Sequence, residues 1–223
     1  MSTAAMIDGP HQKEAIFAAG RPLAEAAAAM VMVHGRGATA ESILTLAEEF
    51  RRPDFAYLAP QAAGFTWYPY SFLAPMHQNE PGLSSGLARI GEVLARIEAA
   101  GIPPERTILL GFSQGACLAL EYAARGSRKP GVVAAFAGGL IGEPGALRAP
   151  IADLTGTSIF LGVGDADGHI PAAQAEESAR LLAEAGATVD FRVYPGVDHA
   201  IRDDEIEAAR ALVTNLPIIA PAV

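Results

Sequence analysis

The chain has 223 residues, of which 51% are hydrophobic and 18% are charged, and its net charge is −9 at pH 7. These values indicate a globular protein with a full core and exclude a disordered chain. The acidic balance leaves no basic stripe for nucleic acid, and no apolar run reaches the roughly 18 residues that span a bilayer.

Short apolar runs of strand length alternate with helix-favouring segments along the chain. We expect seven strands, at 15–18, 29–34, 55–59, 107–112, 131–137, 157–162 and 188–194. We expect helices at 39–50, with Thr39 as its N-cap, and at 83–100, 116–124, 172–185 and 205–216. The longer connections at 61–81 and 142–152 are expected to be loops. This alternation predicts a mostly parallel sheet with helices on both faces. The segments 1–11 and 217–223 are expected to be tails of a single domain that comprises residues 1–223.

A G-x-S-x-G motif at 111–115 lies between the strand 107–112 and the helix 116–124. In this context the motif indicates a nucleophile elbow, in which the serine occupies a strained turn. Side chains at the two glycine positions would collide with the neighbouring strand and helix. We therefore predict Ser113 as a nucleophile and the N–H of Gln114, at the start of the helix, as a donor to an oxyanion.

Polar residues also follow three other strands of the predicted sheet. The segment 34–37 follows the second strand, Asp165 and Asp167 follow the sixth, and His199 comes after the seventh. Because function collects at the carboxyl ends of parallel strands, Ser113, an aspartate and His199 can meet there. A serine hydroxyl needs a base to take its proton, and the base needs a carboxylate. The chain order of serine, acid and histidine therefore predicts an α/β-hydrolase.

Four ordered blocks carry a resemblance to a known family: HGRG at 34–37, GFSQGA at 111–116, GDADGHIP at 164–171 and GVDHAI at 196–201. Over roughly residues 29–214, the chain resembles the phospholipase/carboxylesterase group of α/β-hydrolases, which includes acyl-protein thioesterases and small bacterial carboxylesterases. The resemblance implies the α/β-hydrolase fold. The uninterrupted alternation of strands and helices indicates that this chain has no large cap domain.

The resemblance also implies roles for particular residues. In this family the acid lies in a D-x-x-(V/I)-P sequence, which here begins at Asp167; Asp165 stays the alternative and could instead brace the turn. The family's oxyanion donors are two backbone N–H groups, which correspond here to those of Arg36 and Gln114. A backbone donor does not depend on its side chain, so an arginine at position 36 is compatible with this role.

The loop 61–81 is long and rich in proline, glycine and aromatic residues, and loops of this length in a compact domain are usually functional. We expect its aromatic side chains to form the wall of an acyl pocket, with core packing as the alternative; they are Trp67, Tyr68, Tyr70 and Phe72. His169 is also expected in the substrate site. Gly168 and His169 depart from the family, in which a proline and an apolar pocket residue are common, and this argues against a preference for long acyl chains.

The remaining histidines and the single cysteine receive structural interpretations. We expect His34 to brace its own loop, and His11 and His77 to lie at the surface. Cys117, one helical turn after Ser113, is expected in the core. As the only cysteine it excludes an internal disulfide and indicates a reducing cytoplasm. The sequence has no spacing of His, Cys or acidic residues that is typical of a metal site, so we expect no metal or cofactor.

These observations predict a serine hydrolase that cleaves carboxylic esters of short to medium acyl length through an acyl-enzyme intermediate. Lysophospholipase or acyl-protein thioesterase activity remains open, as does that of a dienelactone-hydrolase-like lactonase, although such lactonases usually carry cysteine at the elbow. A non-catalytic binding protein of the same fold is the last alternative, but such proteins commonly lack a member of the triad. The expected partner is a small-molecule ester, without nucleic acid or integral membrane association, and a homodimer is left open.

Overall fold

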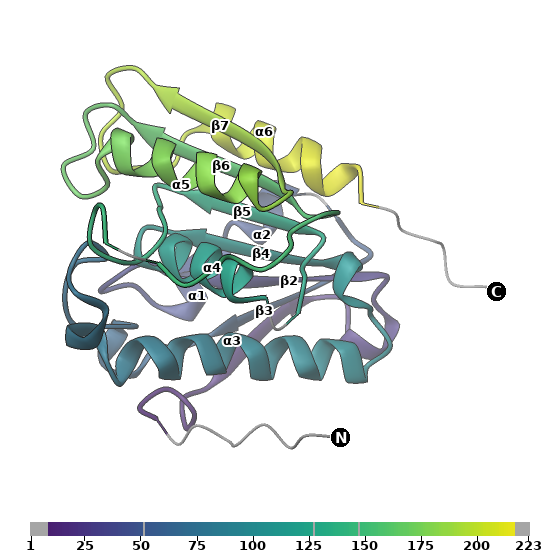
Figure 1. Cartoon of the computed structure of the whole chain (residues 1–223). Coiled ribbons are helices and arrows are strands. Elements are labelled where there is room, and N and C mark those ends of the chain that lie inside the picture. Colours follow the sequence, from purple (N-terminus) through teal and green to yellow (C-terminus); the bar gives the residue numbers. More distant parts are fainter. Residues whose placement is uncertain (1–8, 51, 127, 147, 217–223) are drawn as a thin grey trace.

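The computed structural model describes residues 9–50, 52–126, 128–146 and 148–216. These residues form a seven-stranded sheet in the order β1-β3-β2-β4-β5-β6-β7 (Figure 1). The strands are β1 (Ile16–Gly20), β2 (Ala28–Val33), β3 (Phe55–Pro60), β4 (Thr107–Phe112), β5 (Val132–Phe136), β6 (Ser158–Gly164) and β7 (Thr188–Tyr194). Strand β1 is antiparallel to β3, and every other neighbouring pair is parallel. The prediction of a mostly parallel sheet is therefore confirmed.

Helices cover both faces of this sheet, as the alternation predicts. On one face lie α3 (Gly82–Ala99), α4 (Gln114–Arg125) and α5 (Ala172–Glu184), and on the other lie α1 (Ala40–Leu44), α2 (Ala47–Phe50) and α6 (Asp203–Thr214) (Figure 1). The described residues between β5 and β6 form no helix or strand, so no cap of regular structure is inserted at this point of the chain.

The segment 39–50 forms two short helices, so the prediction of one continuous helix is wrong. Thr39 is the N-cap of α1, as expected, since its hydroxyl oxygen accepts a hydrogen bond from the Ser42 N–H at 3.1 Å. Further along, the Leu46 N–H donates to the carbonyl of Ile43, three residues back. In an α-helix this N–H would donate to the carbonyl four residues back. This tighter turn separates α1 from α2.

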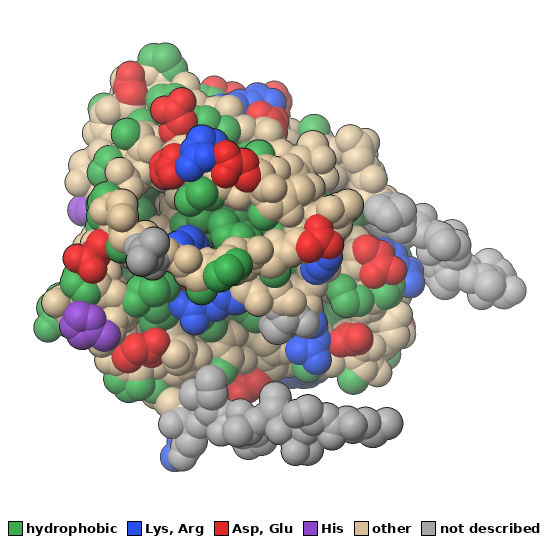
Figure 2. Space-filling view, in the orientation of Figure 1, with side chains coloured by type: hydrophobic (Ala, Val, Ile, Leu, Met, Phe, Trp, Pro, Cys, Tyr) green, Lys and Arg blue, Asp and Glu red, His purple; other side chains and the backbone are tan. Residues whose placement is uncertain are grey.

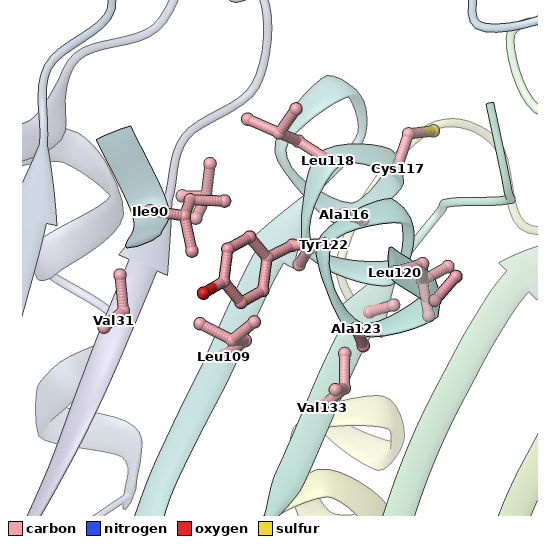
Figure 3. Close-up of a cluster of buried hydrophobic side chains, with 14 of the residues drawn as sticks. Val31, Ile90, Leu109, Ala116, Cys117, Leu118, Leu120, Tyr122, Ala123 and Val133 are labelled. Carbon is pink, nitrogen blue, oxygen red and sulfur yellow. The ribbon is translucent and has the colours of Figure 1, made fainter. Parts of the chain in front are cut away.

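The side chains of the central strand β4 alternate between two hydrophobic cores. Leu109 points toward α3 and α4, where it lies near Ile90 and Tyr122 (Figure 3). Ile108 and Leu110 point to the opposite face and join the core beneath α1, α2 and α6. The strand reads as a continuous apolar run because both of its faces are fully buried.

Charged side chains of both signs are interspersed on the face that α3, α4 and α5 cover (Figure 2). On α5, Arg180 pairs with Glu177 at 2.7 Å. The edge strand β7 is largely half-exposed, as its alternation predicts, and it carries an ion pair between Asp190 and Arg192 at 2.8 Å. In the part of the chain that the structure describes, no helix is long and apolar enough to cross a membrane.

The predicted tails lie mostly outside the described residues, at 1–8 and 217–223. His11, expected at the surface in the first of them, is buried, so that prediction is wrong. Its Nε2–H donates to the Trp67 carbonyl at 2.9 Å, and its Nδ1 accepts from the Ala63 N–H at 3.1 Å. Burial lowers the pKa of His11, which favours the neutral ring that these two bonds require. The contacts fix the start of the described chain against the aromatic loop.

Candidate active site

Ser113 lies at the turn between β4 and α4 with φ = 55° and ψ = −120°, a conformation that residues other than glycine rarely adopt. The flanking glycines permit this turn. A Cβ on Gly111 would lie 2.4 Å from the carbonyl of Gly115, and a Cβ on Gly115 would lie 2.1 Å from the carbonyl oxygen of Val33. The strand and the helix can therefore approach this closely only with glycine at both positions, as the motif predicts.

Ser113, His199 and Asp167 form a continuous chain of hydrogen bonds. The Nε2 atom of His199 lies 2.7 Å from Ser113 Oγ, and its Nδ1 atom lies 2.7 Å from Asp167 Oδ2. The other oxygen of Asp167 accepts hydrogen bonds from the backbone N–H groups of His169 and Ile170, at 2.7 and 2.9 Å.

The electrostatics of Asp167 suit a carboxylate that holds a histidine proton. Burial disfavours its charged form, but the hydrogen bonds from His199 and the two backbone N–H groups outweigh this effect, so the pKa of Asp167 lies below its ordinary value. An ionised Asp167 keeps a proton on Nδ1 of His199. The Nε2 atom of the neutral ring then accepts the proton of Ser113.

Asp165, the alternative acid, has a different partner. Its Oδ1 atom accepts a hydrogen bond from the Gly196 N–H at 2.6 Å, and its own N–H donates to the Tyr194 carbonyl at 3.1 Å. Asp165 thus ties the loop after β6 to the loop after β7. The structure brings Asp167, and not Asp165, into contact with His199.

The loop 34–37 packs directly against the elbow, since a Cβ on Gly35 would lie 3.4 Å from the Cβ of Ser113. His34 braces this loop, as expected. Its Nδ1–H donates to the Gly35 carbonyl at 2.8 Å, and its Nε2 accepts from the Ala62 N–H at 3.1 Å. Burial lowers the pKa of His34, which favours the neutral ring.

A cavity of about 530 Å³ opens beside Ser113. Four of the five residues predicted to form the substrate site line it, namely Tyr68, Tyr70, Phe72 and His169. Arg36, Gln114 and His199 border the same cavity. The predicted nucleophile, base, oxyanion donors and pocket residues therefore meet around one space, although they come from five separate parts of the chain.

Trp67 does not line this cavity, so the prediction that it forms part of the pocket wall is wrong. The side chain is fully buried, and its indole N–H donates to the His34 carbonyl at 2.9 Å. An indole combines a large apolar surface with one donor that needs a partner. Here the partner lies at the end of β2, which draws the ring beneath the loop and away from the substrate space.

Residues 14–216 match the phospholipase/carboxylesterase family. The chain is a member of this family. It is 25% identical to an acyl-protein thioesterase 1 of Neurospora crassa over 217 residues, which cover 86% of this chain and 89% of that protein. A phospholipase/carboxylesterase from Dyadobacter fermentans, known from its crystal structure, is 44% identical in sequence to this chain. The two structures match with a TM-score of 0.86 over 91% of this chain and 97% of that one. The structure of esterase PE8 is 26% identical, with a TM-score of 0.75 over 92% and 99% of the two chains.

Membership confirms three predictions made from the sequence: the family, the α/β-hydrolase fold, and a hydrolase of the carboxylesterase or thioesterase type. The matched region runs from before β1 to the end of the described chain. It therefore contains every residue of the site described above.

In this phospholipase/carboxylesterase family member, the side chain of Gln114 has a structural task that sequence analysis missed. Its amide oxygen accepts from the Trp67 N–H and its amide nitrogen donates to the Tyr68 carbonyl, both at 2.8 Å. The Arg36 guanidinium donates to two further carbonyls of the same loop. These bonds satisfy backbone groups that have no helix or strand partner. They hold the pocket wall against the elbow.

Glu205 is a second residue that sequence analysis missed. It is 1% exposed on the first turn of α6, and its Oε2 atom accepts from the Arg202 N–H at 2.9 Å. Burial raises the pKa of Glu205 to about 7, and the negative charges of Asp204 and Asp167 add to this effect. The bond fixes the end of the loop that carries His199. A glutamate at the third position of a helix is the only local signal for such a contact.

Cys117 lines the cavity but lies fully buried, and burial raises the pKa of its thiol to about 12. The thiol therefore stays protonated at neutral pH and is a poor nucleophile beside Ser113. His77 is exposed, as expected. Among the residues that the structure describes, no cluster of three or more His, Cys, Asp or Glu could hold a metal ion.

The raised pKa of Glu205 makes the stability of the fold dependent on pH. Its ordinary pKa is 4.5, so between about pH 4.5 and 7 the folded state binds more protons than the unfolded state, and stability falls as pH rises through this window. Glu205→Gln keeps an acceptor for the Arg202 N–H but carries no charge. We expect the variant to match the parent near pH 4.5 and to exceed its free energy of unfolding by about 3 kcal/mol at pH 8.

Urea unfolding at several pH values between 4.5 and 8 measures this difference. Glu207→Gln on the exposed side of α6 is the matched control and should change stability little at any pH. Parallel pH profiles for the parent and Glu205→Gln would contradict the prediction.

Proposed function

We propose that the chain is a serine hydrolase that cleaves carboxylic esters of short to medium acyl length through an acyl-enzyme formed on Ser113. The observation that carries this proposal is the hydrogen-bonded chain from Ser113 through His199 to Asp167, at the edge of a cavity large enough for a small ester. In this proposal Ser113 is the nucleophile, His199 the general base and Asp167 the acid that orients it.

The geometry supports a two-step reaction. His199 takes the proton of Ser113 as Oγ attacks the ester carbonyl carbon, and the carbonyl oxygen becomes an oxyanion. The backbone N–H groups of Gln114 and Arg36 would donate to this oxyanion. The imidazolium then protonates the leaving alcohol as its C–O bond breaks. In the second step, water loses a proton to His199 and attacks the acyl carbon. The imidazolium then returns the proton to Ser113 Oγ as the bond to the acyl group breaks, which releases the acid and restores the enzyme.

The lining of the cavity supports short to medium acyl chains. Three of its apolar side chains, Tyr68, Phe72 and Ile170, are no more than 5% exposed, whereas Tyr70 on the same wall is 56% exposed. They cover a chain of a few carbons, and further carbons would extend toward water, where they contribute no hydrophobic free energy. Thioester hydrolysis is the second candidate, because the relative from Neurospora crassa is an acyl-protein thioesterase and the acyl-enzyme chemistry is the same. A cytoplasmic location also remains a proposal, supported by the single cysteine.

The nucleophile is tested first. A fluorophosphonate probe should label Ser113 once, and Ser113→Ala should abolish labelling and lower kcat by on the order of 10⁴–10⁶. Mass spectrometry of the labelled chain locates the adduct, and turnover of p-nitrophenyl butyrate gives kcat. An adduct on Cys117, or labelling that survives in Ser113→Ala, would refute the assignment.

The two aspartates give a matched pair of variants. Asp167→Asn should lower kcat by about 10⁴, because His199 loses the partner that selects its tautomer. Asp165→Asn keeps an oxygen that can accept from the Gly196 N–H, so its kcat should stay close to that of the parent. The comparison requires thermal denaturation curves that show both variants folded. The opposite ranking would assign the acid to Asp165.

The acyl preference can be measured with p-nitrophenyl esters from acetyl to palmitoyl. We expect kcat/KM to rise by up to about fourfold per added CH₂ as far as butyryl or hexanoyl, and then to level off or fall. Phe72→Ala removes a wall of the cavity and should flatten the rise. Phe65→Ala is the control, because Phe65 belongs to the same loop but is exposed and does not line the cavity. A steep rise that continues to palmitoyl would instead favour a lysophospholipase or a depalmitoylating thioesterase.

A further inference from the structure

The cavity beside Ser113 has a charge balance opposite to that of the whole chain. The chain contains 25 acidic and 16 basic residues. Among the described residues that line the cavity there is no aspartate or glutamate, whereas Arg36 contributes a positive charge and His169 a hydrogen-bond donor to its wall. The Asp167 side chain has no exposed surface and lies behind His199. An anion that the rest of the surface repels would therefore meet hydrogen-bond donors here.

Arg36 is held in place by uncharged groups. Its Nη1 donates to the Pro69 carbonyl at 2.9 Å and to the Thr66 hydroxyl at 3.1 Å, and its Nη2 donates to the Tyr70 carbonyl at 2.7 Å. None of these partners neutralises the guanidinium, which is exposed. A cation that is already fixed loses little conformational entropy when it binds an anion.

His169 supplies a second donor on the wall of the same cavity. Its ring centroid lies 4.7 Å from that of His199, and its backbone N–H is fixed by the hydrogen bond to Asp167 at 2.7 Å. The side chain is exposed. An imidazole carries at least one N–H in either protonation state, so His169 can donate to a ligand beside the base at any pH.

We propose that this cavity selects esters that carry a carboxylate near the scissile carbonyl, and that Arg36 and His169 bind this carboxylate. The inference rests on the proposed function, because it names the substrate class of the same site. A guanidinium and an imidazole N–H match the two oxygens of a carboxylate. An uncharged ester would use only the apolar side of the cavity and leave both donors without an anionic partner.

Two pairs of matched substrates test the proposal. In the first pair the carboxylate belongs to the acyl part: monoethyl succinate is compared with its neutral analogue, ethyl succinamate. In the second pair it belongs to the alcohol part: acetoxyacetate is compared with acetoxyacetamide. In at least one of the two pairs, we expect kcat/KM of the anionic ester to exceed that of its neutral partner by about tenfold or more. This factor corresponds to the free energy of one charged hydrogen bond. The ratio should fall as ionic strength rises from about 0.01 to 1 M.

Two variants of Arg36 separate its charge from its support of the loop, and a third variant tests His169. Arg36→Gln removes the charge and should bring the ratio in the preferred pair close to one. Arg36→Lys keeps the charge without the guanidinium fork and should retain part of the preference. His169→Gln should lower the ratio by less than Arg36→Gln does. A loosened loop would lower kcat/KM for both members of a pair and leave their ratio unchanged.

A ratio that does not exceed one in either pair at low salt would overturn the proposal, as would a preference that Arg36→Gln leaves intact. The proposed function is tested separately. If the neutral esters are hydrolysed and this activity is lost in Ser113→Ala, the serine hydrolase stands even where the carboxylate preference fails. If no ester is hydrolysed and the fluorophosphonate probe does not label Ser113, the proposed function itself fails, and the carboxylate preference fails with it.

Discussion

The close contact of α4 with the ends of β2 and β4 is the constraint on which the site depends. A Cβ at Gly111 or Gly115 would overlap main-chain atoms, so the first turn of α4 lies directly against the Val33 carbonyl. The same contact gives Ser113 its strained backbone, which costs on the order of 1–3 kcal/mol. It also directs the positive end of the α4 dipole toward the cavity and brings the loop 34–37 alongside. The burial of β4 in two cores holds this arrangement against its strain.

Side-chain hydrogen bonds, rather than regular structure, hold the pocket wall. Gln114 joins the aromatic loop to α4, the helix that begins directly after Ser113, so the wall and the elbow share one anchor. Beneath the loop, the rings of His11 and His34 each lie 5.1 Å from that of Trp67. Burial favours the neutral form of both histidines, so each ring can accept a hydrogen bond from a backbone N–H. The loop is thereby fixed well enough to shape a cavity.

Local patterns in the sequence predicted most of the fold and which residues meet in the candidate site. Glycine spacing and strand periodicity are local, so the elbow at Ser113 and the order of strands and helices could be predicted. The preference for Asp167 over Asp165 came instead from the resemblance to the family. The placements of Trp67 and His11 could not be predicted, because their partners lie far along the chain and irregular segments have no period that shows which side faces the core. The break within 39–50 was missed for a related reason, since the apolar pattern continues through it.

The edge strand β7 has a consequence for the behaviour of the protein at high concentration. An edge strand offers unpaired N–H and C=O groups on one side, which a strand of another molecule can use to extend the sheet. Here the opposite charges of Asp190 and Arg192 occupy that strand, and a second strand docked beside it would have to desolvate both. The ion pair contributes little to folding at such an exposed position. Its larger effect is to make pairing of a second strand at this edge less favourable.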